Sequence, residues 1–437
     1  MNPYEFLTKF SKFGNKGGFK PGLERVKKVL SYFDNPQDKV DYIHVGGSNG
    51  KGSTVAFLNS ILKNAGYKVG RYVSPPMIHF NERFSINDNP ISTKELESIV
   101  DMLNEYLQNP ETQVDFDEPS FFEIITIIAF IYFYRKNVDI GILEVGLGGR
   151  LDATNVIKKP LVSVITNISY EHADILGPKI EDIAYEKAGI IKENRPVITA
   201  SNNSKVIKVF EKFAREKNSE LTILNIDDKY KVIDKNLDYQ ILDLQLDGIS
   251  YKDLKLKILG THQIYNSVLA LKTLGLLPAR YIIDKKSIYS GLYACRWPGR
   301  LEVVNRNPDI ILDGAHNEDG MKILVRFLKE NVDKHKKIIF LISILKDKNY
   351  TSMLKMLKSL DNDIELLITT NQNKRSLDPK VIADQANMLN IKNKVIYNLY
   401  DSVKEAKKIL NSSDLLCITG SLYTVSEARF YQSILFK

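Results

Sequence analysis

A glycine-rich segment, HVGGSNGKGST from His44 to Thr54, most constrains how this chain folds. An apolar run, Tyr42–Val45, leads into it, and a helical pattern over Gly52–Asn64 follows. A loop of this kind points backbone N–H groups into a concavity, and the helix N-terminus adds partial positive charge, so phosphate groups bind there. The pattern predicts a nucleotide phosphate site in which Lys51 reaches the β- and γ-phosphates.

The segment departs from the standard phosphate-binding loop at two positions. Val45 occupies the first glycine position of GxxxxGK[ST], and Gly52 stands where a hydroxyl residue normally follows the lysine. Ser53 or Thr54 is expected to supply that hydroxyl. A glycine turn without a ligand is the alternative, which the strand–loop–helix context disfavours.

The rest of the chain alternates short apolar runs with helical patterns, which predicts an α/β fold with largely parallel sheets. The first candidate strands are Tyr42–Val45, Val69–Val73, Val138–Val145, Leu161–Thr166 and Val197–Ala200. A second series comprises Ile310–Leu312, Ile338–Ile342, Ile364–Ile368, Lys394–Tyr397 and Leu415–Thr419. Between them, Cys295–Arg300 carries the single tryptophan and a Pro-Gly pair, which is typical of a linker. We expect two doubly wound domains, residues 1–297 and a smaller Rossmann-like domain at 298–437.

Two further segments have a distinct pattern. Ile124–Tyr134 is apolar over 11 residues, against the ~20 needed to span a bilayer, so a buried helix is expected. Leu221–Ile258 alternates β-formers with Asp and Lys, and we expect hairpins at the edge of the first domain.

Composition excludes several classes of protein. Hydrophobic residues make up 43% of the 437 and charged residues 26%, which is the balance of a globular protein with a sizeable core. The net charge of +8 comes from 61 basic and 53 acidic residues that are mixed along the chain, with no basic block. Anionic small molecules, a solvated lysine-rich surface and, less readily, nucleic acid all fit this charge. Two cysteines and no visible secretory signal indicate a reducing cytoplasm and no membrane association.

Glu144 is the second strong signal. It ends the apolar run VDIGILEV and precedes GLGGRLDATN. A carboxylate at the carboxyl end of a strand lies where open α/β sheets bind ligands, and oxygen ligands there suit Mg²⁺ on nucleotide phosphates. A strand-end cap beside a flexible loop is the alternative.

Other polar residues carry little information alone. His172 in EHADILG and Ser74 in SPP read by default as loop residues, and Lys187 in EKAGIIK reads as a solvated helix residue. The DGAHN segment, Asp313–Asn317, could contact a nucleotide or an amine, or could cap a helix.

Together these segments resemble the folylpolyglutamate synthase/dihydrofolate synthase family of the Mur ligase superfamily. The resemblance runs from Gly22 to about Tyr423. It rests on the order and spacing of KPGLERV, HVGGSNGKGS, SPP…NERF, PSFFEIITIIAF, EVGLGGRLDATN, EHADILG, EKAGIIK, HQIYNSVLA, PGRLE, DGAHN and GSLYTV. Two departures stand out, because the family commonly has Pro-His after the serine where this chain has Pro75-Pro76, and DGAHNP where Glu318 replaces the proline.

The resemblance implies a role for each matching residue. It implies ATP contacts from Gly47, Ser48, Asn49, Gly50, Lys51, Gly52, Ser53, Asn266, Arg300 and Asp313. It implies Mg²⁺ ligation by Ser74, Glu144 and His172, and a carbamylated lysine at Lys187 that supports the metal. It implies a catalytic set of Lys51, Lys187 and His316, and substrate contacts from Arg83, Phe122, Asp152, His316 and Ser421.

The resemblance also implies a reaction. A folate carboxylate attacks the γ-phosphate of ATP, and the amine of L-glutamate then displaces phosphate from the acyl phosphate. Lys51 and Mg²⁺ would offset the repulsion between the two anions, and closure about Cys295–Arg300 would shelter the intermediate from water. Folate or dihydropteroate and L-glutamate are the expected partners of a monomeric enzyme.

Three alternatives stay open. A Mur-type ligase acting on a cell-wall precursor would usually carry an additional N-terminal domain, and about 40 residues precede the loop here. A nucleotide-dependent nucleic-acid binder would leave DGAHN and EKAGIIK unexplained. A glutamate-chain extender and an enzyme that also makes dihydrofolate use the same ATP and metal apparatus, so the residues do not separate them.

Overall fold

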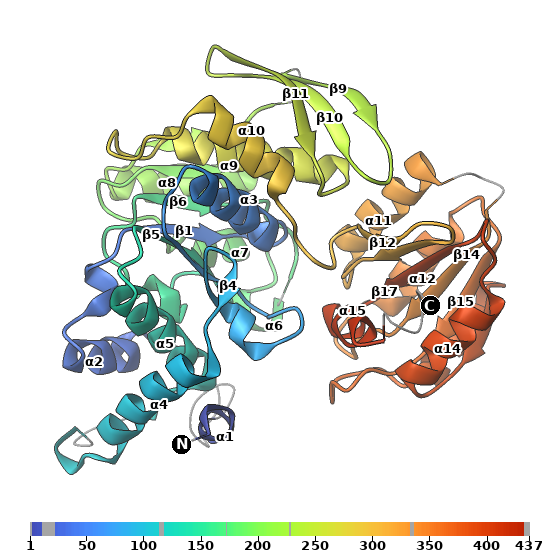
Figure 1. Ribbon diagram of the computed structural model, residues 1–437, viewed down its shortest axis with the longest axis horizontal. Coiled ribbons are helices and arrows are strands. Elements are labelled where there is room, and N and C mark those ends of the chain that lie inside the picture. Colours follow the sequence, from blue (N-terminus) through green and yellow to red (C-terminus); the bar gives the residue numbers. More distant parts are fainter. Residues whose placement is uncertain are drawn as a thin grey trace. The chain divides into compact units, whose positions relative to one another are not determined.

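The chain folds into two compact units (Figure 1). The computed structural model describes residues 2–10, 22–112, 118–171, 173–226, 229–332 and 336–431. The first unit comprises Met1–Lys229 and Ile264–Cys295, and the second comprises Tyr230–Gln263 and Arg296–Lys437. Most of the hairpin segment thus groups with the second unit and not with the first, because Leu237 and Leu259 pack in the second unit's core.

An eight-stranded sheet forms the centre of the first unit. Its order is β4-β3-β2-β5-β1-β6-β7-β8. Strand β3 pairs antiparallel with both β2 and β4, and all other neighbouring strands pair in parallel. The strands are β1 (Tyr42–Gly46), β2 (Val69–Tyr72), β3 (Phe84–Ile86), β4 (Asn89–Pro90), β5 (Ile140–Glu144), β6 (Val162–Ile165), β7 (Val197–Thr199) and β8 (Leu221–Ile223). The predicted strands of this part are confirmed.

Helices cover both faces of this sheet. They are α1 (Pro3–Thr8), α2 (Glu24–Tyr32), α3 (Lys51–Asn64), α4 (Thr93–Gln108), α5 (Phe121–Arg135), α6 (Ala173–Leu176), α7 (Ile180–Ala188), α8 (Ser204–Glu216), α9 (Thr261–Gly275) and α10 (Lys285–Ala294). Figure 1 shows α2, α4 and α5 on one side of the sheet and α3 and α10 on the other. Helix α5 is buried along most of its length, as the apolar run predicts. Within the described ranges, no helix combines the length and apolarity needed to cross a membrane.

The direction of the crossovers along the sheet changes at the carboxyl end of β1. The helix after β1 leads to β2 on one side of the sheet order, whereas α7 and α8 lead in the opposite direction. Right-handed crossovers that move in opposite directions lie on opposite faces of a sheet. The connection after β1 therefore leaves toward one face and the connections after β5 and β6 leave toward the other, and open α/β sheets bind ligands at such a point.

The second unit holds two sheets. A three-stranded antiparallel sheet has the order β11-β10-β9, and a six-stranded sheet has the order β12-β13-β17-β14-β15-β16. The strands are β9 (Tyr230–Lys235), β10 (Gln240–Leu246), β11 (Ile249–Leu256), β12 (Glu302–Asn305), β13 (Asp309–Leu312), β14 (Ile338–Ile342), β15 (Ile364–Ile368), β16 (Lys392–Val395) and β17 (Leu415–Thr419). The helices are α11 (Glu318–Asn331), α12 (Tyr350–Lys358), α13 (Pro379–Met388), α14 (Leu399–Ile409) and α15 (Leu422–Arg429). The predicted α/β class, with a parallel sheet in each unit, is confirmed.

Candidate active site

The glycine-rich loop joins β1 to α3, as predicted. The strand ends at Gly46 and the helix begins at Lys51. The Nζ of Lys51 donates hydrogen bonds to the carbonyls of Gly47 (2.8 Å) and Ser48 (2.9 Å). The ammonium is thus held at the loop itself, within reach of a phosphate bound to the loop's N–H groups.

The loop is fastened to the segment after β6. The backbone N–H of Ser48 donates to the carbonyl of Asn167 at 2.8 Å, and its hydroxyl donates to the carbonyl of Ser169 at 3.1 Å. The amide of Asn49 donates to the hydroxyl of Ser169 at 3.1 Å. Gly47 has a φ of +129°, and a Cβ there would lie 1.9 Å from the hydroxyl oxygen of Thr166. The loop's shape therefore depends on glycine and on this neighbouring segment.

Asn266 reaches the same loop from α9. Its side-chain oxygen lies where a Cβ on Gly50 would be 2.6 Å away. The residue is 216 positions from Gly50 in the sequence, and the fold brings the two together. The structure thereby joins the predicted ATP contact Asn266 to the predicted phosphate loop.

Lys187 is buried beside the loop. Its side chain is 2% exposed, and its Nζ pairs with the Oε1 of Glu171 at 2.7 Å. The Nζ also donates to the carbonyl of Gly47 at 2.9 Å. Burial lowers the pKa of Lys187 to about 8 and the charge of Lys51 adds to this, whereas Glu171 opposes it. The surface-lysine interpretation is therefore wrong, because the last turn of α7 points this side chain into the unit's interior.

Glu171 completes this charged cluster. Burial raises its pKa, but the charges of Lys187 and Lys51 outweigh burial and bring the pKa to about 2. The carboxylate is therefore ionised between two cations. Glu171 is a candidate functional residue that the sequence patterns did not indicate, although it lies in the EHADILG segment immediately before His172. His172 itself lies outside the described residues.

Glu144 and Ser74 meet at the ends of neighbouring strands. The backbone N–H of Ser74 donates to the Oε2 of Glu144 at 3.2 Å, and Glu144 is 6% exposed. Strand β5, which ends at Glu144, lies between β2 and β1. A carboxylate and a hydroxyl at one sheet edge next to a phosphate loop fit a Mg²⁺ ion, which prefers oxygen ligands. Among the described residues, no group of three or more His, Cys, Asp or Glu side chains could by itself hold a metal.

Asp152 organises the loop that follows Glu144. One carboxylate oxygen accepts from the N–H groups of Gly146 (3.0 Å) and Leu147 (2.9 Å). The other accepts from the N–H (3.0 Å) and the hydroxyl (2.5 Å) of Thr154. Burial raises the pKa of Asp152, and these hydrogen bonds oppose the shift. His44 Nε2 lies 2.8 Å from the same hydroxyl, which ties β1 to this loop.

The predicted substrate contacts Arg83 and Phe122 lie on adjoining elements of the first unit. The guanidinium of Arg83 lies 5.6 Å from the ring centre of Phe80 and 6.0 Å from that of Phe121. The ring of Phe122 occupies the space beside Gly146, where a Cβ would be 2.3 Å from Cζ. Arg83 thus lies beside the aromatic rings of Phe80 and Phe121, and Phe122 borders the loop that carries Asp152.

The remaining predicted residues belong to the second unit and gather at the ends of β13 and β17, which are neighbours. Asp313 accepts from the N–H groups of Leu301 (2.8 Å) and Ala315 (3.0 Å). Burial raises the pKa of Asp313, and the charge of Arg300 opposes this. His316 Nδ1 lies 2.9 Å from the carbonyl of Gly314, and Ser421 accepts from the N–H of Tyr423 at 3.1 Å.

Two family models match this chain. "Mur ligase middle domain" matches residues 45–274, and "Mur ligase, glutamate ligase domain" matches residues 299–422. The dihydrofolate synthase/folylpolyglutamate synthase of Bacillus subtilis is 37% identical over 425 residues, which cover 95% of both chains. This chain belongs to the dihydrofolate synthase/folylpolyglutamate synthase family.

Solved structures of this family agree with the fold. Folylpolyglutamate synthase from Thermotoga maritima is 36% identical, with a TM-score of 0.82 over 98% of this chain and 96% of that one. E. coli FolC in complex with DHPP and ADP is 26% identical, with a TM-score of 0.86 over 99% of this chain and 98% of that one. The family resemblance read from the motifs is therefore confirmed over nearly the whole chain.

Proposed function

We propose that this protein is an ATP-dependent ligase that adds L-glutamate to folates, with the formation of dihydrofolate from dihydropteroate as a second activity. The observation that carries the proposal is the arrangement of side chains at the carboxyl ends of β1, β5 and β2. There a phosphate loop with Lys51 lies beside the strand-end carboxylate of Glu144 and the buried Lys187. The membership in the dihydrofolate synthase/folylpolyglutamate synthase family supports the choice of substrates.

The proposed reaction has two steps. An oxygen of the substrate carboxylate bonds to the γ-phosphorus of ATP, and the bond to the leaving ADP oxygen breaks. The nitrogen of L-glutamate then attacks the acyl carbon, loses a proton and displaces phosphate to form the amide. Both steps bring anions together, so we assign Lys51 and the loop N–H groups to offset the negative charge on the transferred phosphoryl group.

We assign Ser74 and Glu144 to hold Mg²⁺, with His172 as a third ligand implied by the family. The ion would supply positive charge that offsets the negative charge of the nucleotide phosphates. Glu144 is suited to this because its carboxylate is buried at the end of β5 and is oriented by the N–H of Ser74.

We further propose that Lys187 is carbamylated. An ammonium buried at 2% exposure is costly, and its pKa of about 8 makes the neutral amine accessible near neutral pH. The amine nitrogen would attack CO₂ and lose a proton, giving an anionic carbamate. Because Glu171 already contributes a negative charge there, we expect the carbamate to depend on Lys51 and Mg²⁺ for compensation.

The other assignments follow from matching motifs. We assign Asn266, Arg300 and Asp313 to the nucleotide, and His316 and Ser421 to the incoming glutamate. Arg83, Phe122 and Asp152 would line the folate site. The assignments of Asp313, His316 and Ser421 are supported by their position, because all three residues follow the ends of the neighbouring strands β13 and β17.

We also propose a cytoplasmic monomer that acts on small molecules and not on nucleic acid, with 1–297 and 298–437 as its functional domains. The two cysteines and the mixed distribution of charge support the compartment and the small-molecule partners, and the family models over residues 45–274 and 299–422 support the division into domains.

The deciding experiment measures ADP release by the purified protein with Mg²⁺ and L-glutamate. Dihydropteroate and a reduced folate are supplied in separate reactions, and the products are identified by mass. An added mass of one glutamate in both reactions supports the bifunctional enzyme, and addition to the reduced folate alone supports a chain extender. Turnover with neither, but with a UDP-linked cell-wall precursor, would favour the Mur-type alternative.

A further inference from the structure

The segment from Ser74 to His79 follows β2 and carries a proposed metal ligand at its start. It leads into a short 3₁₀-helix, η2 (Phe80–Arg83), which precedes β3. At its first residue, the N–H of Ser74 donates to Glu144. At its far end, three consecutive N–H groups point at a single side chain, that of Glu82.

Glu82 accepts all three of these hydrogen bonds. Its Oε2 accepts from the N–H of Met77 at 2.9 Å and of Ile78 at 3.0 Å, and its Oε1 accepts from the N–H of His79 at 3.0 Å. The carbonyl of Glu82 in turn accepts from the hydroxyl of Ser85 in β3 at 3.1 Å. A carboxylate bonded to successive N–H groups makes charge-assisted hydrogen bonds, which are about twice as strong as neutral ones. The path of the segment is therefore set by this side chain.

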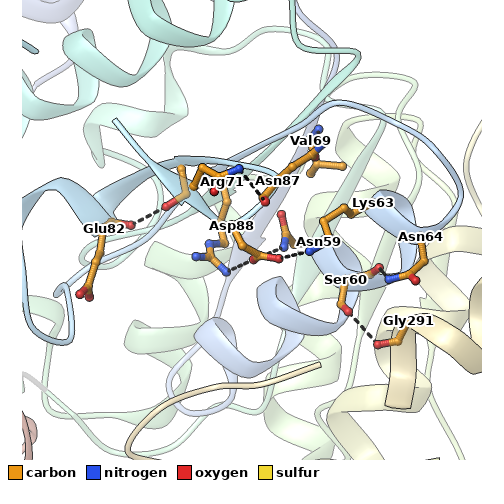
Figure 2. A network of polar contacts seen from close by, with 12 residues as sticks. Asn59, Ser60, Lys63, Asn64, Val69, Arg71, Glu82, Asn87, Asp88 and Gly291 are labelled. Carbon is orange, nitrogen blue, oxygen red and sulfur yellow. Dashed lines mark hydrogen bonds and ion pairs between the residues drawn. The ribbon is translucent and has the colours of Figure 1, made fainter. Parts of the chain in front are cut away.

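The strands on either side of the segment are fixed to the helix of the phosphate loop. Figure 2 shows this network, in which Asp88 after β3 accepts from Arg71 of β2 (3.0 Å) and from Asn59 (2.8 Å) and Lys63 (2.7 Å) of α3. Burial raises the pKa of Asp88, but Lys63 and Arg71 outweigh burial and lower it. Strand β2 thus has a defined position relative to α3. The hydrogen bonds of Glu82 fix the segment that follows β2 in the same way.

We propose that Glu82 is a positioning residue for the ligation reaction. Its carboxylate holds residues 74–79 so that Ser74, whose N–H donates to Glu144, stays next to that carboxylate. Glu82 acts through the backbone of Met77, Ile78 and His79 and need not touch substrate, which distinguishes it from its neighbour Arg83. This inference rests on the proposed function for its kinetic readout but not for its structural one.

The test compares Glu82→Ala and Glu82→Gln with wild type. Glutamine keeps one acceptor oxygen and should behave as an intermediate, because its amide nitrogen cannot accept a hydrogen bond. Glu95→Ala is the matched control. Like Glu82, Glu95 belongs to the first unit and accepts from a backbone N–H, that of Ser92 at 3.1 Å, at the start of α4.

The first readout is amide hydrogen exchange, which requires no turnover. We expect the N–H groups of Met77, Ile78 and His79 to exchange faster in Glu82→Ala, by about tenfold or more, and Glu95→Ala to leave them unchanged. The second readout is the Mg²⁺ concentration at half-maximal ligation. We expect a rise of about 10- to 100-fold in Glu82→Ala, which is the range for residues that orient metal ligands, while the KM for ATP changes less than about twofold.

Each outcome is decisive for the inference. Unchanged exchange at residues 77–79 in Glu82→Ala would overturn it, because the contacts would not hold the segment. Faster exchange with an unchanged Mg²⁺ requirement and unchanged substrate KM would also overturn it, because the role would be structural alone. If wild type ligates no folate, the proposed function fails separately. The inference then depends on whether Mg²⁺ with a non-hydrolysable ATP analogue protects the Ser74 amide in wild type but not in Glu82→Ala.

Discussion

Lys187 offers the sharpest test of the chemistry proposed for this site. With a pKa of about 8, about a quarter of the amine is neutral at pH 7.5, whereas about 0.1% of an ordinary lysine is neutral there. Burial therefore increases the reactive form by about 200-fold. Only the neutral amine takes up CO₂, so the structure predicts a carbamate on Lys187 whose amount rises as the pH increases from 7 through 8.

The assay uses ¹³C-labelled bicarbonate and observes the carbamate carbon by NMR. Lys192 provides the matched control, because burial also lowers its pKa to about 8 but its Nζ donates to the carbonyl of Asn155 at 2.9 Å, away from the loop. Lys192 can therefore give a carbamate signal of its own, and we expect Lys187→Ala to remove a signal that Lys192→Ala keeps. Lys187→Ala should also lose ligation and regain part of it with formate or acetate. A Lys187→Ala spectrum that keeps every carbamate signal of the wild type, or a fully active Lys187→Ala, would refute the reasoning.

The lowered pKa of Lys187 also predicts how the free energy of unfolding changes with pH. The folded state has the lower pKa, so the unfolded chain binds more protons between pH 8 and 10.5. The buried ammonium costs about 3 kcal/mol below pH 8, and this cost disappears as the pH rises through that window. In bicarbonate-free buffer, the free energy of unfolding of wild type relative to Lys187→Ala should rise by about that amount between pH 8 and 10.5. A constant difference would show that Lys187 has an ordinary pKa.

Three substitutions probe the rest of the site. Lys51→Ala should lower the ligation rate by about 100-fold or more with an unchanged circular dichroism spectrum, because it removes charge at the phosphate and little packing; near-normal turnover would contradict the nucleotide assignment. Gly47→Ala should abolish nucleotide binding, measured by calorimetry, because its Cβ would collide with Thr166; unaltered binding would show that the loop can rearrange. Glu144→Ala should raise the Mg²⁺ concentration at half-maximal rate by about tenfold or more, and overlapping titrations would make Glu144 a structural cap.

Local sequence patterns were sufficient to predict the strands and the strand ends at which the candidate site residues lie. The runs ending at Val45 and Glu144 are apolar and bounded by glycine, so strand identity and the position of the following loop could both be predicted. The grouping of β9–β11 could not, because it depends on which core receives Leu237 and Leu259. Side-chain alternation shows that a strand has a buried face but not what covers it.

The interior of the site was less accessible to prediction. Lys187 and the carbonyl of Gly47 are 140 residues apart, and Asn266 is farther still from Gly50. Such contacts follow from the stacking of α7 and α9 around the sheet, which no local pattern encodes. The resemblance indicated that Lys187 matters, but its pairing with Glu171 follows only from the folded structure. Glu82 was missed for a similar reason, since its hydrogen bonds go to backbone groups that any sequence provides.

The return of the chain to the phosphate-loop helix has a consequence for biosynthesis. Helix α10 packs against α3, where the hydroxyl of Ser60 donates to the carbonyl of Gly291 at 2.7 Å (Figures 1 and 2). The strands β9–β11 intervene in the sequence, so α10 follows the start of α3 by about 230 residues. At ribosomal rates of about 5–20 residues per second, α10 is synthesised roughly 10 to 50 s after α3. The first unit therefore completes its fold late in translation, because the side of α3 that α10 covers has no covering helix until then.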